Sequence, residues 1–258
     1  GETADTLAAL RLAKNKKIPT LAIVNVIGST IAREADYVFY TLAGPEISVA
    51  TTKAYSAQLI AGDLLAIQMA YMKGKIDSEG YKKLIIELQK IPNLIEKILL
   101  DSKERIQWFA SKYANAKDVF FIGRGIDYAV SMEGSLKLKE ISYIHSEAYA
   151  AGELKHGPIA LIEQGSLVIA VATQPNIAAK TISNIQETIA RGANVILFTI
   201  DGQEVGNVKE TYILPDVDPI LQPVLVAVPL QQIAYYAAGL KGCDVDKPRN
   251  LAKSVTVE

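Results

Sequence analysis

Short apolar runs alternate along the chain with longer stretches of helical periodicity. Runs rich in Val, Ile and aromatic residues are typical of strands buried in a parallel sheet. They occupy residues 20–26, 37–42, 118–122, 166–173, 195–200 and 212–214. Helical spacing of apolar residues covers 6–14, 52–73, 177–191 and 219–240. This alternation predicts an α/β fold with parallel sheets flanked by helices, in which ligands bind outside the carboxyl ends of the strands.

The order of these elements repeats in the two halves of the chain. A helix, a strand, a Gly-containing loop, a second strand and a long helix ending in Lys-Gly occur in both halves. The second half has two further strands and a helix in front, so we expect the first domain to be truncated at its N-terminus. We predict two tandem flavodoxin-like domains over 1–75 and 117–242, a helical linker over 76–116 interrupted by Pro92, and a tail over 243–258.

Composition narrows the classes of function. The 27 Lys and Arg residues balance 28 Asp and Glu, giving a net charge of -1, so bulk charge indicates neither nucleic-acid nor membrane binding. No uninterrupted apolar run reaches the roughly 18 residues of a membrane span, and no signal peptide opens the chain. The single cysteine, Cys243, excludes an internal disulfide, and with only two histidines a metal site is not expected. We expect a reducing, cytoplasmic setting.

Glu133, Lys137 and Glu140 lie on one face of the helix predicted after residue 125. Spacings of four and three residues are typical of surface ion pairs, which is the simpler interpretation. However, the apolar residues of this helix leave little of it to face solvent, and buried charges need partners or a chemical task. These apolar residues are Leu136, Leu138, Ile141 and Ile144.

His156 is the better functional candidate of the two histidines. It precedes Gly157 in a turn, where binding and catalytic residues are common, whereas His145 is expected to be structural, near the end of the apolar helix. The Gly-Arg-Gly turn at residues 123–125 follows a strand, but it lacks the third glycine of a dinucleotide fingerprint. We therefore expect a structural turn there and no nicotinamide cofactor.

Hydroxyl groups precede both helices of the first half. Thr3 and the free N-H groups of its helix could surround a phosphate, although a simple N-cap is the preferred interpretation. The stretch SVATTK, which contains Thr51, precedes the next long helix with the same ambiguity. The polar run from 246 to 258 is typical of a disordered tail, but its β-branched residues and Lys253 favour an ordered strap.

Three long segments resemble the sugar isomerase (SIS) half of the glutamine:fructose-6-phosphate aminotransferase family. They are GETADTLAALRLAK at the start, EGSLKLKEISYIHSEAYAAGELKHGP in the middle and DKPRNLAKSVTVE at the end. In that family a glutaminase domain releases ammonia, and two SIS domains convert fructose 6-phosphate to glucosamine 6-phosphate. The resemblance, which extends over essentially the whole chain, implies a homodimeric enzyme that binds sugar phosphates and needs no metal or organic cofactor.

The resemblance also implies roles for single residues. Glu140 would be the base that moves a proton between C1 and C2, and Lys253 would attack or polarise the open-chain ketone. His156 would assist ring opening in the site of the neighbouring subunit, and Lys137 would lie near the substrate oxygens. A carboxylate can shuttle such a proton, and a lysine amine can form an iminium with a ketose. Further substrate contacts would come from Thr3, Val49, Thr51 and Ala252.

The chain departs from the family pattern at its start. The glutaminase domain with its catalytic cysteine and the serine-rich phosphate loops are absent before Gly1, so Cys243 should not be given the role of that cysteine. We expect this chain to be unable to use glutamine and to bind sugar phosphate poorly. Two alternatives are a stand-alone sugar-phosphate isomerase or deaminase and a sugar-phosphate sensor. The C-terminal match favours the aminotransferase, and a sensor would not need a proton shuttle.

Overall fold

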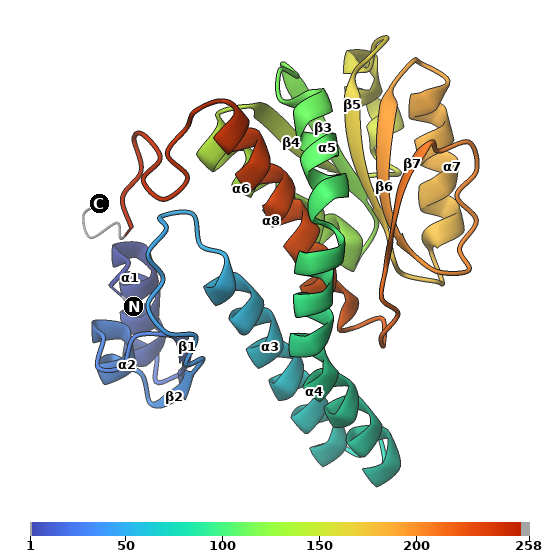
Figure 1. Ribbon diagram of the computed structural model, residues 1–258. Coiled ribbons are helices and arrows are strands. Elements are labelled where there is room, and N and C mark those ends of the chain that lie inside the picture. The colour runs from blue at the N-terminus through green and yellow to red at the C-terminus, as the bar shows by residue number, and fades with distance from the viewer. Residues whose placement is uncertain (1, 254–258) are drawn as a thin grey trace. The chain divides into compact units, whose positions relative to one another are not determined.

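The computed structural model describes residues 2–253, which form two compact units (Figure 1). The first unit contains residues 2–75 together with 246–253, and the second contains residues 76–245. Residues 76–116, predicted as a linker, belong to the second unit because their helices pack on its long C-terminal helix. The division into four parts made from the sequence stays a prediction.

The first unit contains a two-stranded parallel sheet. Strand β1 (Leu21–Val24) pairs with β2 (Tyr37–Tyr40), and the small core beside them contains Ala22, Val24 and Ile31. The flanking helices are α1 (Ala4–Asn15) and α2 (Thr30–Glu34), and α3 (Lys53–Met72) follows β2.

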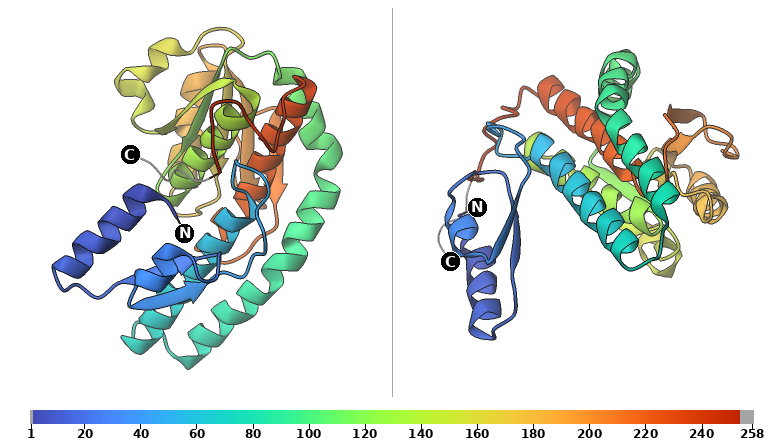
Figure 2. Two further views of the ribbon diagram at one scale, coloured as in Figure 1. Left: turned by 90° about the vertical axis from the view of Figure 1, so that its left-hand side faces the viewer. Right: turned by 90° about the horizontal axis from the view of Figure 1, so that it is seen from below.

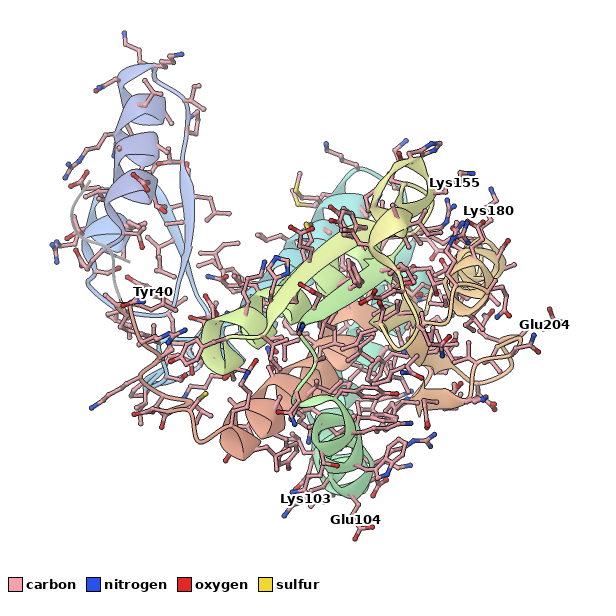
Figure 3. All side chains as sticks on the ribbon, turned by 90° about the horizontal axis from the view of Figure 1, so that it is seen from above. Tyr40, Lys103, Glu104, Lys155, Lys180 and Glu204 are labelled. Atoms are coloured by element: carbon pink, nitrogen blue, oxygen red, sulfur yellow. The ribbon has the colours of Figure 1, made fainter. Side chains whose placement is uncertain are left out.

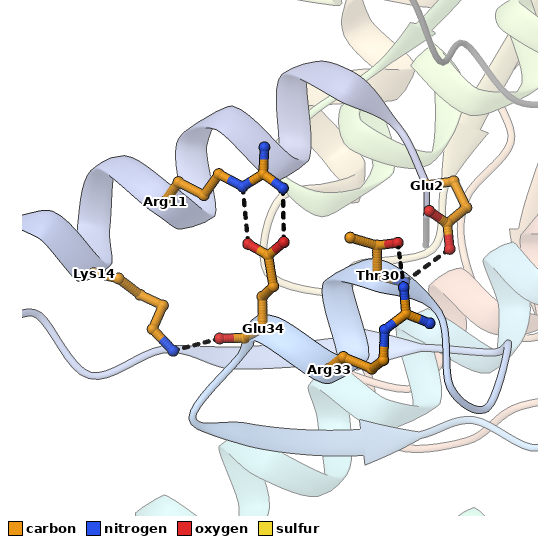
Figure 4. Close-up of polar contacts among 6 residues, drawn as sticks. All are labelled: Glu2, Arg11, Lys14, Thr30, Arg33 and Glu34. Atoms are coloured by element: carbon orange, nitrogen blue, oxygen red, sulfur yellow. Dashed lines mark hydrogen bonds and ion pairs between the residues drawn. The ribbon is translucent and has the colours of Figure 1, made fainter.

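An ion pair fastens the two short helices of the first unit to each other. The Arg11 guanidinium on α1 donates to both Glu34 carboxylate oxygens on α2, at 2.9 and 2.7 Å (Figure 4). This planar two-point geometry holds the pair better than a single contact would, although both side chains are partly exposed to solvent.

The second unit contains a five-stranded sheet in which every pair of neighbouring strands is parallel. The order is β4-β3-β5-β6-β7, which is the flavodoxin-like order 2-1-3-4-5 in terms of chain position. In this order the crevice for a ligand lies between the carboxyl ends of β3 and β5. The strands are β3 (Asp118–Gly123), β4 (His145–Ala150), β5 (Leu167–Ala172), β6 (Asn194–Ile200) and β7 (Glu210–Leu214).

Helices cover both faces of this sheet, with α7 on one face and α6 and α8 on the other (Figures 1 and 2). Phe120 and Ile122 of β3 point toward the α7 side, whereas Phe121 between them lies against α6 and α8. Helices α4 and α5 pack on α8. The helices are α4 (Ser78–Asp101), α5 (Lys103–Tyr113), α6 (Ile126–Ser142), α7 (Ala178–Ile189) and α8 (Gln222–Leu240), with short 3₁₀ turns η1 (Leu154–His156) and η2 (Pro158–Leu161).

Two features of the second unit differ from the sequence-based expectations. Pro92 does not interrupt the helices, because α4 runs unbroken from Ser78 to Asp101 with Pro92 inside it. The strand β4 was not predicted, and His145 is its first residue and not the end of a helix. There His145 Nδ1 lies 2.7 Å from Asp118 Oδ1 on the neighbouring strand, so the structural role expected for His145 has a concrete partner.

Helix α8 is long and apolar enough, by length and composition, to cross a membrane. Its two prolines and three glutamines break the apolar run in the sequence. In the structure 67% of the apolar window is buried. This burial is typical of a core helix, which agrees with the packing of α4, α5 and α6 against α8.

Gly134 allows α6 to approach α8 closely. A Cβ atom there would lie 2.8 Å from Leu230 Cδ1 and 3.0 Å from Phe121 Cε1. We predict that Gly134→Ala lowers the free energy of unfolding by about 1–3 kcal/mol through overpacking, despite the better helix propensity of alanine. Urea unfolding followed by the fluorescence of Trp108, the only tryptophan, measures this in the second unit.

Gly239 on α8 is the matched control for this substitution. A Cβ atom added there meets nothing within 4 Å. Gly239→Ala should therefore leave stability unchanged or raise it by up to about 1 kcal/mol. Equal effects of the two substitutions would contradict the proposed packing constraint.

Candidate active site

Helix α6 carries a buried row of charges. Lys137 Nζ lies 2.7 Å from Glu140 Oε2 and 3.6 Å from Glu133 Oε1. Only 6% of the Lys137 side chain is exposed, against 12% for Glu133 and 22% for Glu140. The interpretation as a solvated surface pair is therefore wrong, because α6 is held between the sheet and α8. The ammonium group is enclosed by its two carboxylate partners.

The two carboxylates of this row differ in their electrostatic environment. Burial raises the pKa of Glu133, the nearby charge of Glu140 raises it further, and the Lys137 ammonium opposes both effects. The oxygens that face Lys137, Glu133 Oε1 and Glu140 Oε2, have no hydrogen-bond partner among the described residues apart from these ion pairs. Glu140, the more exposed of the two carboxylates, is thus the one more accessible to a substrate.

His156 is held at the tip of a loop that follows β4. Leu154, two residues before it, is only 1% exposed and belongs to the core on the α7 side of the sheet. The Ala151 N-H donates to the Gly123 carbonyl at 2.8 Å, and Gly157 has φ of 153°, which favours glycine. The imidazole and its neighbour Lys155 are exposed, and Figure 3 shows Lys155 at the outer end of this loop. The loop therefore presents His156 outward from a fixed base.

Glu140 and His156 of one chain lie at opposite ends of the second sheet. Helix α6 starts after the carboxyl end of β3 and ends before the amino end of β4, so Glu140 in its last turn is near the amino ends of the strands. His156 follows the carboxyl end of β4. The six residues of β4 separate the two ends by roughly 20 Å. The structure does not bring these two side chains together within a chain.

The described part of the tail returns to the loop before α3. The Lys253 ammonium donates a hydrogen bond to the Ser48 carbonyl, and the Val49 N-H donates to the Asp246 carbonyl at 3.0 Å. Lys253 and Ala252 are exposed, whereas Val49 and Thr51 are partly buried. The structure thus brings together Lys253 and the stretch around Val49, which are about 200 residues apart in the sequence. As far as residue 253, the tail is the ordered strap; 254–258 lie outside the described residues.

Thr3 occupies the N-cap position of α1. Its backbone is extended, and its carbonyl accepts from the Leu7 N-H at 3.0 Å, but its hydroxyl makes no capping hydrogen bond. The hydroxyl is exposed. The side-chain cap favoured from the sequence is therefore not made, which leaves the hydroxyl available to another partner.

Some functional features were missed from the sequence. Glu133 was treated only as one end of an ion pair, although its burial makes it part of the charged row. Asp127 was not singled out, yet it is 1% exposed and bonded to Thr173. The alternation of HSEAYA was the available signal for β4. Within residues 2–253, no three His, Cys, Asp or Glu side chains are grouped so that they could hold a metal ion.

Comparison with known proteins places this geometry in a family. The SIS domain family matches residues 1–68 and 112–241. The C-terminal domain of glucosamine-fructose-6-phosphate aminotransferase from Francisella tularensis superposes with a TM-score of 0.91 and is 39% identical, over 96% of this chain and 71% of that chain.

Two longer relatives are also aminotransferases of this kind. The whole chain is 60% identical to the glutamine–fructose-6-phosphate aminotransferase (isomerizing) of Caldanaerobacter subterraneus and covers 43% of it. The corresponding enzyme of Methanosarcina mazei is 51% identical, with 42% covered. The chain thus spans less than half the length of these relatives. By these matches the chain belongs to the SIS domain family, and within it to the C-terminal SIS region of the glutamine–fructose-6-phosphate aminotransferases.

Proposed function

We propose that this chain is the isomerase part of an enzyme that converts fructose 6-phosphate and ammonia to glucosamine 6-phosphate. The observation that carries the proposal is the buried row on α6, in which a partly exposed Glu140 is paired with Lys137. In the longer enzyme a glutaminase domain would supply the ammonia. Identity of 60% and 51% to two aminotransferases over the whole of this chain, against 24% to a glucosamine-6-phosphate deaminase of the same fold, makes this the preferred function over the alternatives.

Glu140 is the proposed base of the isomerisation. Ammonia adds to the C2 ketone of the open-chain sugar, and loss of water leaves an imine. The Glu140 carboxylate takes a proton from C1; the electrons of that C-H bond form the C1-C2 double bond, and the imine electrons move to nitrogen, which takes up a proton from solvent that the later release of the O1 proton balances. Return of the proton to C2, with loss of the O1 proton, gives the amino aldose. One carboxylate that faces both carbons suffices for this transfer.

Lys137 and Glu133 are proposed to orient Glu140 and to balance its charge. An ammonium 2.7 Å from Glu140 Oε2 orients the carboxylate and stabilises negative charge on nearby substrate oxygens. Glu133 on the other side of Lys137 keeps the ammonium fixed and compensated while Glu140 changes its protonation state.

Lys253 is proposed to form an iminium with the ketone or to polarise it. Its ammonium bonds to the Ser48 carbonyl, so the tail holds it beside the loop that contains Val49 and Thr51. These two residues and Ala252 are proposed to contact the sugar. Thr3, whose hydroxyl makes no cap bond, is proposed to contact the phosphate, where the positive end of the α1 dipole favours an anion.

His156 is proposed to open the sugar ring in the site of the partner subunit of a homodimer. Its position at the carboxyl end of the sheet, roughly 20 Å of strand from the end where Glu140 lies, supports this arrangement. A histidine is suited to the step because its imidazole exchanges protons near neutral pH.

We predict that Glu140→Gln in the full-length enzyme lowers kcat for glucosamine 6-phosphate formation by about 10²–10⁴-fold, with fructose 6-phosphate binding retained, because the amide cannot accept the C1 proton. Turnover and calorimetric binding are measured on the same preparation. Glu163→Gln, in the exposed loop before β5, is the control and should be unaffected. Turnover near the wild-type level would remove Glu140 as the base.

We predict that mixed dimers of Glu140→Gln and His156→Ala subunits recover activity that neither variant has alone. If His156 acts in the partner's site, one of the two sites in each mixed dimer contains an intact Glu140 and an intact His156. Purification through both affinity tags selects the mixed dimers, so about half of the wild-type activity per dimer returns. The measurement is turnover after co-expression with two affinity tags. A mixture as inactive as its parents would show that both residues act within one chain.

We predict that Lys137→Met lowers the free energy of unfolding by about 3 kcal/mol, because two half-buried carboxylates lose the ammonium that they share. Urea unfolding monitored by Trp108 measures the loss. The matched control is Lys139→Met, two residues along the same helix and exposed, which should change stability by less than about 0.5 kcal/mol. Similar effects at the two positions would mean that Lys137 is solvated after all.

A further inference from the structure

The second unit has its own ligand crevice by topology, at the carboxyl ends of β3 and β5. The loop after β3 opens α6, and the loop after β5 begins at Thr173. In parallel sheets of this order the positive end of the helix and the free N-H groups of the neighbouring loop commonly receive a phosphate or another anion.

Asp127 fills this crevice with a carboxylate from the chain itself. Its Oδ2 accepts from the Thr173 N-H at 2.8 Å, and its Oδ1 accepts from the Thr173 hydroxyl at 2.6 Å. The nearby Gln174 N-H helps to lower the pKa of the same carboxylate. The side chain is in the first turn of α6 and 1% exposed. A backbone N-H group, a hydroxyl and a helix N-terminus are donors that a bound oxyanion uses.

The backbone keeps the carboxylate in place. The end of β3 approaches the first turn of α6 so closely that a Cβ atom at Gly123 would lie 2.5 Å from the Asp127 carbonyl carbon. Gly125 between them has φ of 56°, and the Asp127 N-H donates to the Arg124 carbonyl at 3.1 Å. Burial raises the pKa of Asp127, while the hydrogen bonds from residues 173 and 174 oppose that rise and favour the ionised form.

We infer that Asp127 is a built-in substitute for a ligand anion, which closes the crevice of the second unit to a bound oxyanion. This inference does not depend on the reaction proposed above. The ligand class excluded from the crevice is an oxyanion, such as the phosphate of a sugar phosphate.

Chemical rescue of Asp127→Ala tests the inference. Removing the carboxylate leaves the N-H and hydroxyl donors of Thr173 without their acceptor, so the midpoint of thermal unfolding should fall by about 5–10 °C. Formate, which replaces the lost carboxylate, and inorganic phosphate should each restore about half or more of that loss relative to chloride at equal ionic strength, because they bind the folded state. Wild type gives the baseline for anion effects elsewhere.

Two control variants show whether rescue requires an empty, buried position in place of the Asp127 carboxylate. Asp127→Asn fills the same space, so formate should not stabilise it. Asp77→Ala removes another carboxylate at a helix N-terminus, which accepts from the Gly80 N-H at 2.8 Å but is exposed, and should gain nothing from either anion. A folded Asp127→Ala that neither anion stabilises more than these controls would overturn the inference.

A second measurement tests the same inference if Asp127→Ala does not fold. In the wild-type chain, addition of inorganic phosphate should leave the amide resonances of Thr173 and its neighbour Gln174 unmoved, because Asp127 already occupies the anion position at Thr173. Saturable shifts of these two resonances would show that the crevice is open to an anion and would overturn the inference.

Discussion

The close contact of α6 with α8 is the constraint on which the charged row depends. Because Gly134 adds no side chain at the crossing, the two helices approach until Leu230 and Phe121 fill the space. Lys137, one turn further along, is then carried into the interior with 6% of its side chain exposed. A buried ammonium must be compensated, and the carboxylates one turn before and one turn after it do so. Packing thus creates the electrostatic arrangement of the candidate site.

Most of the fold follows from local patterns in the chain. The buried strands β3, β5 and β6 are continuous apolar runs, which only the centre of a parallel sheet explains well. The strand β4 lies at the edge of the sheet and is only partly buried. Its HSEAYA sequence therefore lacks a continuous apolar run, and the pattern does not distinguish it from the following loop. Pro92 was expected to end a helix because it lacks an N-H group, but α4 tolerates it within a continuous helix.

The candidate site could be predicted only in part. Ion pairs at spacings of three and four residues look the same on a solvated and on a buried helix, so the pattern alone did not distinguish them at Glu133 and Glu140. The contact of Lys253 with Ser48 joins positions 205 residues apart and has no local signal. Nor did any pattern indicate that β4 lies beside β3 and not at the other edge, which is the pairing that fixes where the His156 loop leaves the sheet.

The edge position of β4 also means that the loop after β4 and the charged row on α6 differ in how well they tolerate change. A strand at the edge has one hydrogen-bonded neighbour. A change in the length or sequence of the loop that follows it therefore disturbs the hydrogen bonds to one strand only. The α6 row, by contrast, is enclosed by the sheet and α8. A change of side-chain volume there would alter the packing of several elements. His156 thus follows an edge strand, whereas Glu140 lies on a helix that is enclosed by several elements.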